Sequence, residues 1–291
     1  MKSGFAIIIG RSNVGKSTLL NRLIGTKLSI VTNVPQTTRK NVHGILNTEE
    51  GQVIFIDTPG VLKGGHGGLS GQMIDQVKET LHGIDVIIYV ADPSRSIGSE
   101  ERYTLSLIRG ADVTKILVIN KIDLPEKEKP YIEDYRAIGA EEFTSVIELS
   151  AGEGTHIKSL VNAVMEAMPE GEPIYPMNQR TNLTKEEWVA EIIREKALNE
   201  SRAELPYAMH VVVDSIVEKD ADETKGKPRM FVVSARILVS ADRYKKMLIG
   251  TGGRIIKEIG SVARKELEGI LDSKVFLELE VETDEKWTRY I

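Results

Sequence analysis

Short apolar runs alternate with helix-like stretches over the first half of the chain. The runs contain almost only apolar side chains, and they are Phe5–Ile9, Val53–Ile56, Val86–Val90, Ile116–Ile119 and Val146–Leu149. Runs of this length without polar alternation are typical of strands buried on both faces, so they predict an α/β fold with a mostly parallel sheet covered by helices. Ligands of such sheets bind at the carboxyl ends of the strands, so we expect the chemistry in the turns that follow the runs.

The pattern changes after about Met168, where Pro169, Gly171, Pro173 and Pro176 lie close together and indicate a linker. A helix is then expected from Thr184, followed by two alternating strands, a short helix, a Gly-rich turn, a long helix and a final strand. This order, α-β-β-α-α-β, is typical of an α+β domain. We therefore predict a first domain over residues 1–172, a linker over 173–183 and a second domain over 184–291.

The turn after the first run carries a phosphate-binding pattern, Gly-x-x-x-x-Gly-Lys-Ser, and opens a Leu-rich helix. Its glycines let backbone N–H groups approach phosphate oxygens, and the helix N-terminus adds its positive dipole end. Lys16 supplies a charge for the β- and γ-phosphates, and Ser17 offers a hydroxyl to Mg²⁺. A chance Gly-rich turn is the alternative, which the flanking strand and helix disfavour. The predicted phosphate-binding residues are Gly10, Arg11, Ser12, Asn13, Val14, Gly15, Lys16, Ser17 and Thr18.

The second run ends in Asp57-Thr58-Pro59-Gly60, followed by Val61. Asp57 lies where a carboxylate can reach Mg²⁺ through water, and Gly60 lets its N–H approach the γ-phosphate. Alone, these four residues would be an ordinary turn. About forty residues after a phosphate loop and at a strand end, Asp57, Thr58, Pro59, Gly60 and Val61 are predicted to belong to the nucleotide site.

Asn120-Lys121-Ile122-Asp123 follows the fourth run and indicates guanine. One carboxylate, Asp123, can accept hydrogen bonds from both N1–H and N2–H₂ of guanine, whereas adenine offers neither donor. An unpaired buried charge costs about 1–3 kcal/mol or more, so such a site discriminates strongly. Lys121 can lay its methylene stem over the base, and Ser150-Ala151, after the fifth run, would contact the same base.

These motifs, in this order, resemble the translation-factor-related GTPases. The segment Val34-Pro35-Gln36-Thr37-Thr38-Arg39 and the C-terminal domain narrow this resemblance to the Era family of bacterial GTPases. The resemblance to that family covers nearly the full length of the chain. The resemblance implies a P-loop NTPase domain followed by a type II KH domain, with GTP or GDP and Mg²⁺ as cofactors. It implies that Ser17 and a switch threonine hold Mg²⁺, and the position of Asp57 at the end of its strand adds that residue to the predicted metal site. We assign the threonine to Thr38, with Thr37 as the alternative, and we expect residues 30–38 and 60–71 to act as switch segments.

Val61 occupies the position where Ras-like enzymes place a water-orienting glutamine. We therefore expect slow intrinsic hydrolysis, dominated by phosphate and Mg²⁺ electrostatics, with Lys16, Asn13, Thr38 and Gly60 as the catalytic residues. In related GTPases an asparagine at the position of Asn13 helps to hold K⁺. Stimulation by K⁺ is accordingly a hypothesis, and its alternative is that asparagine suits a tight turn.

Gly250-Thr251-Gly252-Gly253 joins two predicted helices and fits the Gly-x-x-Gly loop with which KH domains clamp about four nucleotides. Alone, such a turn would more often cap a helix; the surrounding order of elements favours RNA. The predicted RNA contacts are Gly250, Thr251, Gly252, Gly253, Arg254 and Lys257. The family resemblance implies small-subunit (16S) ribosomal RNA near its 3′ end as the target and a role in 30S subunit assembly.

The chain of 291 residues has no cysteine and a formal net charge of −5. Disulfides and thiolate metal sites are excluded, and RNA or membrane contact must come from local basic patches. No apolar run is long enough to span a membrane. We expect a cytoplasmic monomer, with at most weak peripheral attraction to the inner face of the cell membrane. Two alternatives remain: an RNA-binding scaffold in which GTP is structural, and a GTPase whose C-terminal domain binds membrane or protein.

Overall fold

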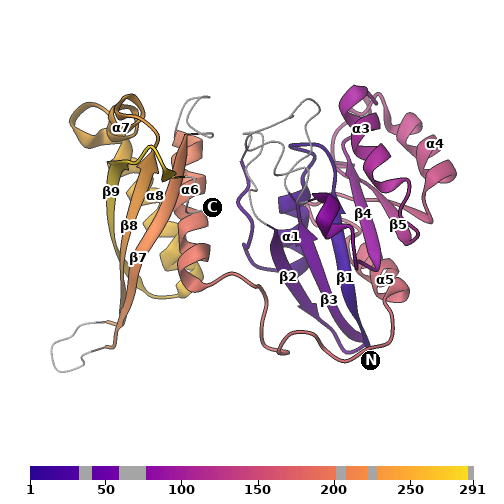
Figure 1. Ribbon diagram of the computed structural model, residues 1–291, viewed down its shortest axis with the longest axis horizontal. Helices are drawn as coiled ribbons and strands as arrows, with labels where there is room; N and C mark the ends of the chain where they lie inside the picture. The colour runs from indigo at the N-terminus through magenta and orange to yellow at the C-terminus, as the bar shows by residue number, and fades with distance from the viewer. Residues whose placement is uncertain (33–40, 59–76, 201–207, 222–227, 288–291) are drawn as a thin grey trace. The chain divides into compact units, whose positions relative to one another are not determined.

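The computed structural model describes residues 1–32, 41–58, 77–200, 208–221 and 228–287. The chain divides into two compact units, with the division between Asn182 and Leu183 (Figure 1). Within the described ranges, no helix is both long enough and apolar enough to cross a membrane.

The first unit is a six-stranded sheet with helices on both faces. Its strands are β1 (Lys2–Ile9), β2 (Val42–Asn47), β3 (Gly51–Asp57), β4 (Val86–Ala91), β5 (Thr114–Ile119) and β6 (Ser145–Glu148). Its described helices are α1 (Lys16–Ile24), α3 (Ser99–Ile108), α4 (Ile132–Glu142) and α5 (Ile157–Ala167), with a short 3₁₀ turn over Glu126–Glu128.

The strand order is β2-β3-β1-β4-β5-β6. All neighbours are parallel except β2, which pairs antiparallel with β3 at the edge. The five apolar runs are confirmed as β1, β3, β4, β5 and β6. The sequence pattern did not predict β2, because His43 and Gly44 interrupt its apolar residues and an edge strand is only partly buried.

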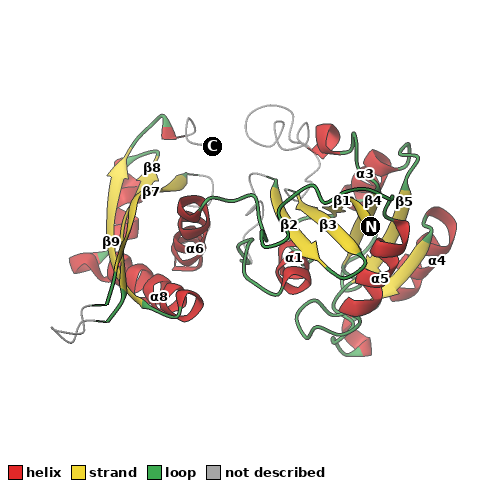
Figure 2. Ribbon diagram, turned by 90° about the horizontal axis from the view of Figure 1, so that it is seen from below, coloured by secondary structure: helices red, strands yellow, loops and turns green. Residues whose placement is uncertain are grey.

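Two layers of helices cover the sheet. One face packs against α3 and α4 in a single core cluster that includes Ile87, Tyr89, Leu105 and Tyr135. On the other face α1 contacts α5 and lies against β1, β2 and β3 (Figure 2). Because the parallel strands share one direction, the turns after β1, β3, β5 and β6 meet at one edge of the sheet.

Most of the segment predicted as a linker, residues 173–183, lies along the edge of the first unit. Gln52, fully buried in β3, accepts the backbone N–H groups of Ile174 and Tyr175 at 2.8 Å each and donates to the Tyr175 carbonyl at 2.8 Å. Further along, the Ile45 N–H donates to the Arg180 carbonyl at 2.9 Å. The segment thus runs beside β2 as an attached strap, a name we keep for residues 174–182.

The second unit has the predicted order of elements, which is therefore confirmed. The elements are α6 (Lys185–Glu200), β7 (Met209–Lys219), β8 (Met230–Val239), α7 (Asp242–Ile249), α8 (Arg254–Leu271) and β9 (Lys274–Thr283). The sheet order is β7-β8-β9, antiparallel between β7 and β8 and parallel between β8 and β9. Thr184 begins α6 as a capping box, since its hydroxyl accepts the Glu187 N–H at 3.1 Å while Glu187 accepts the Thr184 N–H at 3.0 Å. Helix α8 buries Ile259, Ala263 and Leu267.

Candidate functional site

The phosphate loop lies where the motif predicted it, between β1 and α1. Gly15 has φ of 101°, and a Cβ there would lie 2.3 Å from Nδ2 of Asn120. The left-handed conformation and the close approach both require glycine at this position. The loop therefore combines a tight backbone with the open N-terminus of α1, which is the arrangement that holds phosphate.

Lys16 is buried at the base of the loop. Its Nζ donates to the carbonyl oxygens of Gly10, at 3.1 Å, and Arg11, at 2.7 Å. Burial lowers the pKa of the Lys16 ammonium to about 8, while the negative charges of Asp57 and Glu101 act in the opposite direction. The ammonium is thus charged at neutral pH and lies inside the loop, where a β- or γ-phosphate would be held.

Ser17 and Asp57 come together from α1 and the end of β3. The Ser17 hydroxyl donates to Oδ2 of Asp57 at 2.8 Å, and Asp57 is fully buried. Thr58 is also buried, and its hydroxyl donates to the Ile8 carbonyl at 2.9 Å, which fixes the end of β3 against β1. A hydroxyl and a carboxylate oxygen at this spacing are the hard ligands that suit Mg²⁺, so the donor set fits that ion.

Asn120 connects the guanine motif to the phosphate loop. Its Nδ2 donates to the Val14 carbonyl at 2.8 Å, and its Oδ1 accepts the Ala151 N–H at 2.9 Å. The carbonyl and the following N–H of a trans peptide point in opposite directions, so holding the Val14 carbonyl also fixes the direction of the Gly15 N–H. The structure therefore gives the Asn120 side chain a positioning role between three motifs.

Lys121, Asp123 and Ser150 lie on the same edge of the sheet. Lys121 has φ of 61°, and its Nζ contacts Oδ2 of Asp92 at 2.5 Å and the Asn13 carbonyl at 3.4 Å. Asp123 is exposed, whereas Ser150 is fully buried. Lys121 thus lies beside the phosphate loop, and the Ile122 N–H, which donates to the Leu149 carbonyl at 3.3 Å, joins the turn after β5 to the end of the fifth run.

The Arg11 side chain turns toward α3. Its Nη2 donates to Oε2 of Glu100 at 2.7 Å, and its Nη1 lies 3.3 Å from Oε2 of Glu101. Arg95 donates through Nη1 to the Ser12 carbonyl at 2.9 Å. No motif includes these three partners, and sequence reasoning missed them. The sequence offers one signal in retrospect, Glu101 itself, an acid on the face of α3 that otherwise carries the apolar residues Leu105 and Ile108.

Several predicted site residues lie outside the described residues. These are Thr38 with its alternative Thr37, and Pro59, Gly60 and Val61, together with most of the first expected switch segment and all of the second.

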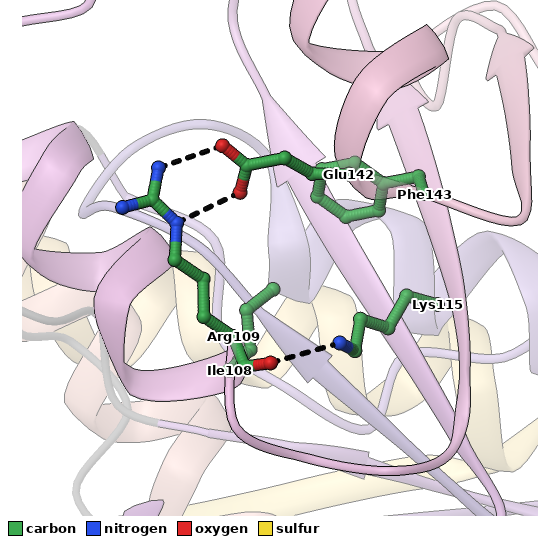
Figure 3. A pocket seen from close by; sticks show the side chains of 5 residues that line it. All are labelled: Ile108, Arg109, Lys115, Glu142 and Phe143. Carbon is green, nitrogen blue, oxygen red and sulfur yellow. Dashed lines mark hydrogen bonds and ion pairs between the residues drawn. The ribbon is translucent and has the colours of Figure 1, made fainter.

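A shallow hollow of about 290 Å³ lies near the start of β5, at the other end of that strand from the guanine motif. Figure 3 shows its polar groups engaged with one another. Arg109 forms two hydrogen bonds with Glu142, at 2.6 and 2.9 Å, and Lys115 donates to the Arg109 carbonyl at 3.2 Å. The hollow offers no group that the nucleotide chemistry needs.

In the second unit, the Gly-x-x-Gly loop is a tight turn between α7 and α8. Gly252 has φ of 62° and Gly253 has φ of 77°. A Cβ added at Gly252 would meet no atom of the described residues within 4 Å, so the space beside it is open to a ligand. Arg254 and Lys257 are exposed on the first turn of α8, next to this space.

The apolar residues beside this loop are only partly buried. Ile249, Ile255 and Ile256 are intermediate in exposure, between core and surface. Half-buried apolar side chains next to a Gly-x-x-Gly loop and exposed cations form a surface on which bases can lie while phosphates contact the loop.

Comparison with known proteins places both units. The family described as "50S ribosome-binding GTPase" matches residues 5–121, and the KH domain family matches residues 204–288. GTPase Era of Staphylococcus epidermidis is 38% identical over 288 residues, covering 98% of this chain and 93% of that protein.

Solved structures agree with this result. A variant of Aquifex aeolicus Era bound to GDP·AlF₄⁻ matches with 37% identity and a TM-score of 0.88, covering 99% of this chain and 96% of the other. Era in complex with MgGDPNP and nucleotides 1506–1542 of 16S ribosomal RNA matches with 36% identity, a TM-score of 0.89 and the same coverage. With relatives this similar over the whole of both units, the chain belongs to the Era family of GTPases.

Proposed function

We propose that this GTPase uses GTP and Mg²⁺ to control its binding to small-subunit ribosomal RNA near the RNA 3′ end, and that it acts in assembly of the 30S subunit. One observation carries the proposal. The chain contains both a phosphate loop that is hydrogen-bonded to the guanine motif and a Gly-x-x-Gly turn flanked by cations. Over 99% of its length, this chain matches an Era complex that contains MgGDPNP and 16S RNA.

In this proposal, each group at the sheet edge has one task. The loop N–H groups and Lys16 hold the phosphates, and Asp123 selects guanine, with Lys121 and the Ser150-Ala151 turn against the base. Ser17 and Asp57 hold Mg²⁺ together with Thr38, or Thr37 in the alternative assignment. The contact between Ser17 and Asp57 at 2.8 Å supports the metal assignment.

Hydrolysis is proposed to be slow without a partner, because Val61 has no polar atom to orient water. Asn13 adopts φ of 62° in the phosphate loop, and we propose that it helps to hold K⁺ there. Turnover measured in K⁺ and in Na⁺ buffers tests this point, and equal rates would remove it.

The proposed domains are residues 1–172 and 184–291, joined by 173–183. We place the protein in the cytoplasm, and we propose in addition that it makes weak peripheral contact with the inner face of the cell membrane. Flotation with anionic vesicles tests that contact: recovery of the protein with the vesicles supports it, and recovery without them contradicts it.

The coupling of nucleotide to RNA is tested with a labelled RNA that ends in the 16S 3′ sequence. RNA affinity is measured by fluorescence anisotropy with GDPNP and with GDP. We expect RNA to bind at least about fivefold tighter with GDPNP, the lower end of usual coupling between two sites. Equal affinities would leave an RNA-binding scaffold in which nucleotide is structural.

The RNA contact is tested with Gly252→Asp and Gly253→Asp combined. Two carboxylates in the loop repel phosphate, so RNA affinity should fall roughly tenfold or more, a loss of about 1.4 kcal/mol. The matched control combines Gly110→Asp and Gly269→Asp, which add the same charge at two exposed glycines where a Cβ would meet no described atom. The control should bind RNA as the parent does. An equal loss in both variants would point to net charge alone and contradict the assigned loop.

A further inference from the structure

Glu101 is a buried acid outside every GTPase motif. It lies in the first turn of α3, and its side chain is 1% exposed. It shares the buried face of the helix with Leu105 and Ile108, which belong to the core. A carboxylate in such surroundings is costly unless it is partnered, and a buried ion pair seldom adds net stability over apolar residues. Its presence therefore calls for a role other than packing.

Both carboxylate oxygens of Glu101 are engaged. The Tyr89 hydroxyl, from β4, donates to Oε1, and Nη1 of Arg11 lies 3.3 Å from Oε2. Burial, and then the charge of Glu101, raises the pKa of Tyr89, so the hydroxyl stays protonated and remains a donor. The carboxylate is thus fixed by the central sheet and directed at the guanidinium of a phosphate-loop residue.

The contact reaches the inner part of the loop through Arg11. The Arg11 carbonyl accepts the Lys16 ammonium at 2.7 Å, so a displaced Arg11 would move an acceptor of the phosphate-binding lysine. Beside it, Arg95 holds the Ser12 carbonyl at 2.9 Å. Since the carbonyl and the next N–H of a trans peptide point in opposite directions, this bond fixes the Asn13 N–H as well. The loop is therefore held by its side chains and carbonyls, which leaves its N–H groups to face the phosphates.

We propose that Glu101 is a positioning residue for GTP binding, which acts through Arg11 to keep the phosphate loop in its phosphate-binding conformation. The proposal rests on GTP binding by the loop. It gives the segment from the end of β4 to the first turn of α3 a role in positioning the phosphate loop. Glu101 and Arg95 carry this role, and neither belongs to a GTPase motif.

Glu101→Gln in the full chain is the first test, because glutamine keeps the size of the side chain and removes its charge. Loss of uniform binding raises KM and leaves kcat unchanged, so KM for GTP should rise about tenfold while kcat stays within about twofold. Release of a fluorescent GDP analogue should quicken by a similar factor. A role in stability alone would lower kcat by reducing the folded fraction and leave KM unchanged, and that result would overturn the proposal.

Glu100→Gln is the matched control. Glu100 also pairs with Arg11, but its side chain is 36% exposed, so water can replace it. We expect KM to change by less than about threefold, within the range of a surface ion pair. An equal effect in both variants would overturn the specific role of Glu101.

The path through Arg11 is tested by a double-mutant cycle with Arg11→Met. If Glu101 acts through Arg11, the double variant should have the KM of Arg11→Met alone. If the two substitutions instead raise KM by factors that multiply in the double variant, Glu101 acts independently of Arg11 and the proposed action through Arg11 is contradicted. Should Glu101→Gln not fold, Glu101→Asp, which keeps the charge but withdraws it by one methylene, is measured by the same criteria.

Discussion

Lys16 is the residue in which burial and function meet most directly. Its ammonium is buried inside the phosphate loop and donates to the carbonyl oxygens of Gly10 and Arg11. Burial favours the neutral form of a lysine, and nearby carboxylates oppose this without restoring the ordinary pKa. With a pKa of about 8, the Lys16 ammonium keeps at neutral pH the charge that phosphate needs.

We predict that GDP affinity falls as the pH rises through about 8, where Lys16 loses its proton. Below that pH the Lys16 ammonium stays charged, so its titration should cause no change in GDP affinity. Titration calorimetry between pH 6.5 and 9.5 measures the effect. Lys16→Met should bind weakly and lack this decline, whereas a similar decline in that variant would assign it to another group.

At the residue scale, the sequence predicted the site residues that belong to motifs with a known spacing and missed those that belong to none. Gly10 to Ser17 form one string with a known spacing, and the structure places Gly10–Gly15 in the turn after β1 and Lys16 and Ser17 at the start of α1. Glu101 and Arg95 contact the same loop from more than eighty residues away. No sequence motif links Glu101 to Arg11 or Arg95 to Ser12, because these contacts arise when α3 and the turn before it pack beside the phosphate loop.

The strap, residues 174–182, shows a similar limit at the scale of elements. Pro176 within it, with Pro169 and Pro173 just before it, indicated a linker, and such segments are often free of contacts. Here Gln52, which precedes the apolar run of β3, supplies hydrogen bonds that attach the strap to the edge of the sheet. The strap also covers β2, the strand that the pattern missed, through the Ile45 and Arg180 backbones.

Gln52→Ala should lower the free energy of unfolding by about 2 kcal/mol, because it removes three hydrogen bonds between a fully buried side chain and partly buried backbone groups of the strap. Urea denaturation followed by far-UV circular dichroism measures this change. Gln179→Ala is the control, since Gln179 makes one local bond to Thr181 and should cost less than about 0.5–1 kcal/mol. A cost for Gln52→Ala no larger than for the control would contradict the attachment of the strap.

Elements of the second unit were easier to predict. Strands β7, β8 and β9 alternate apolar and polar residues, and α8 carries a clear apolar face with Ile259, Ala263 and Leu267. Periodicity therefore fixed their type, and the Gly-rich turn over Gly250–Gly253 fixed where α7 ends and α8 begins. The Gly-x-x-Gly loop gained its meaning only from this order of elements, since the same four residues could cap an ordinary helix.

At the scale of the whole molecule, the charge beside the Gly-x-x-Gly loop is opposite in sign to the net charge of the chain. The net charge is −5, yet Arg254 and Lys257 are exposed beside the Gly-x-x-Gly loop. An acidic protein that presents a local basic surface attracts RNA there and little elsewhere. The nucleotide edge of the first unit and this loop are therefore distinct sites, which is the condition for one to regulate the other.

The central claim is that the turns after β1, β3 and β5 form one pocket for Mg·GTP, with the purine chosen by Asp123. Titration calorimetry of the full chain with GTP and with ATP, each in Mg²⁺, tests this claim most directly. We predict that GTP binds at least about a hundredfold tighter than ATP, because adenine leaves the carboxylate without a donor. Equal affinities for the two nucleotides, or binding of neither, would contradict it.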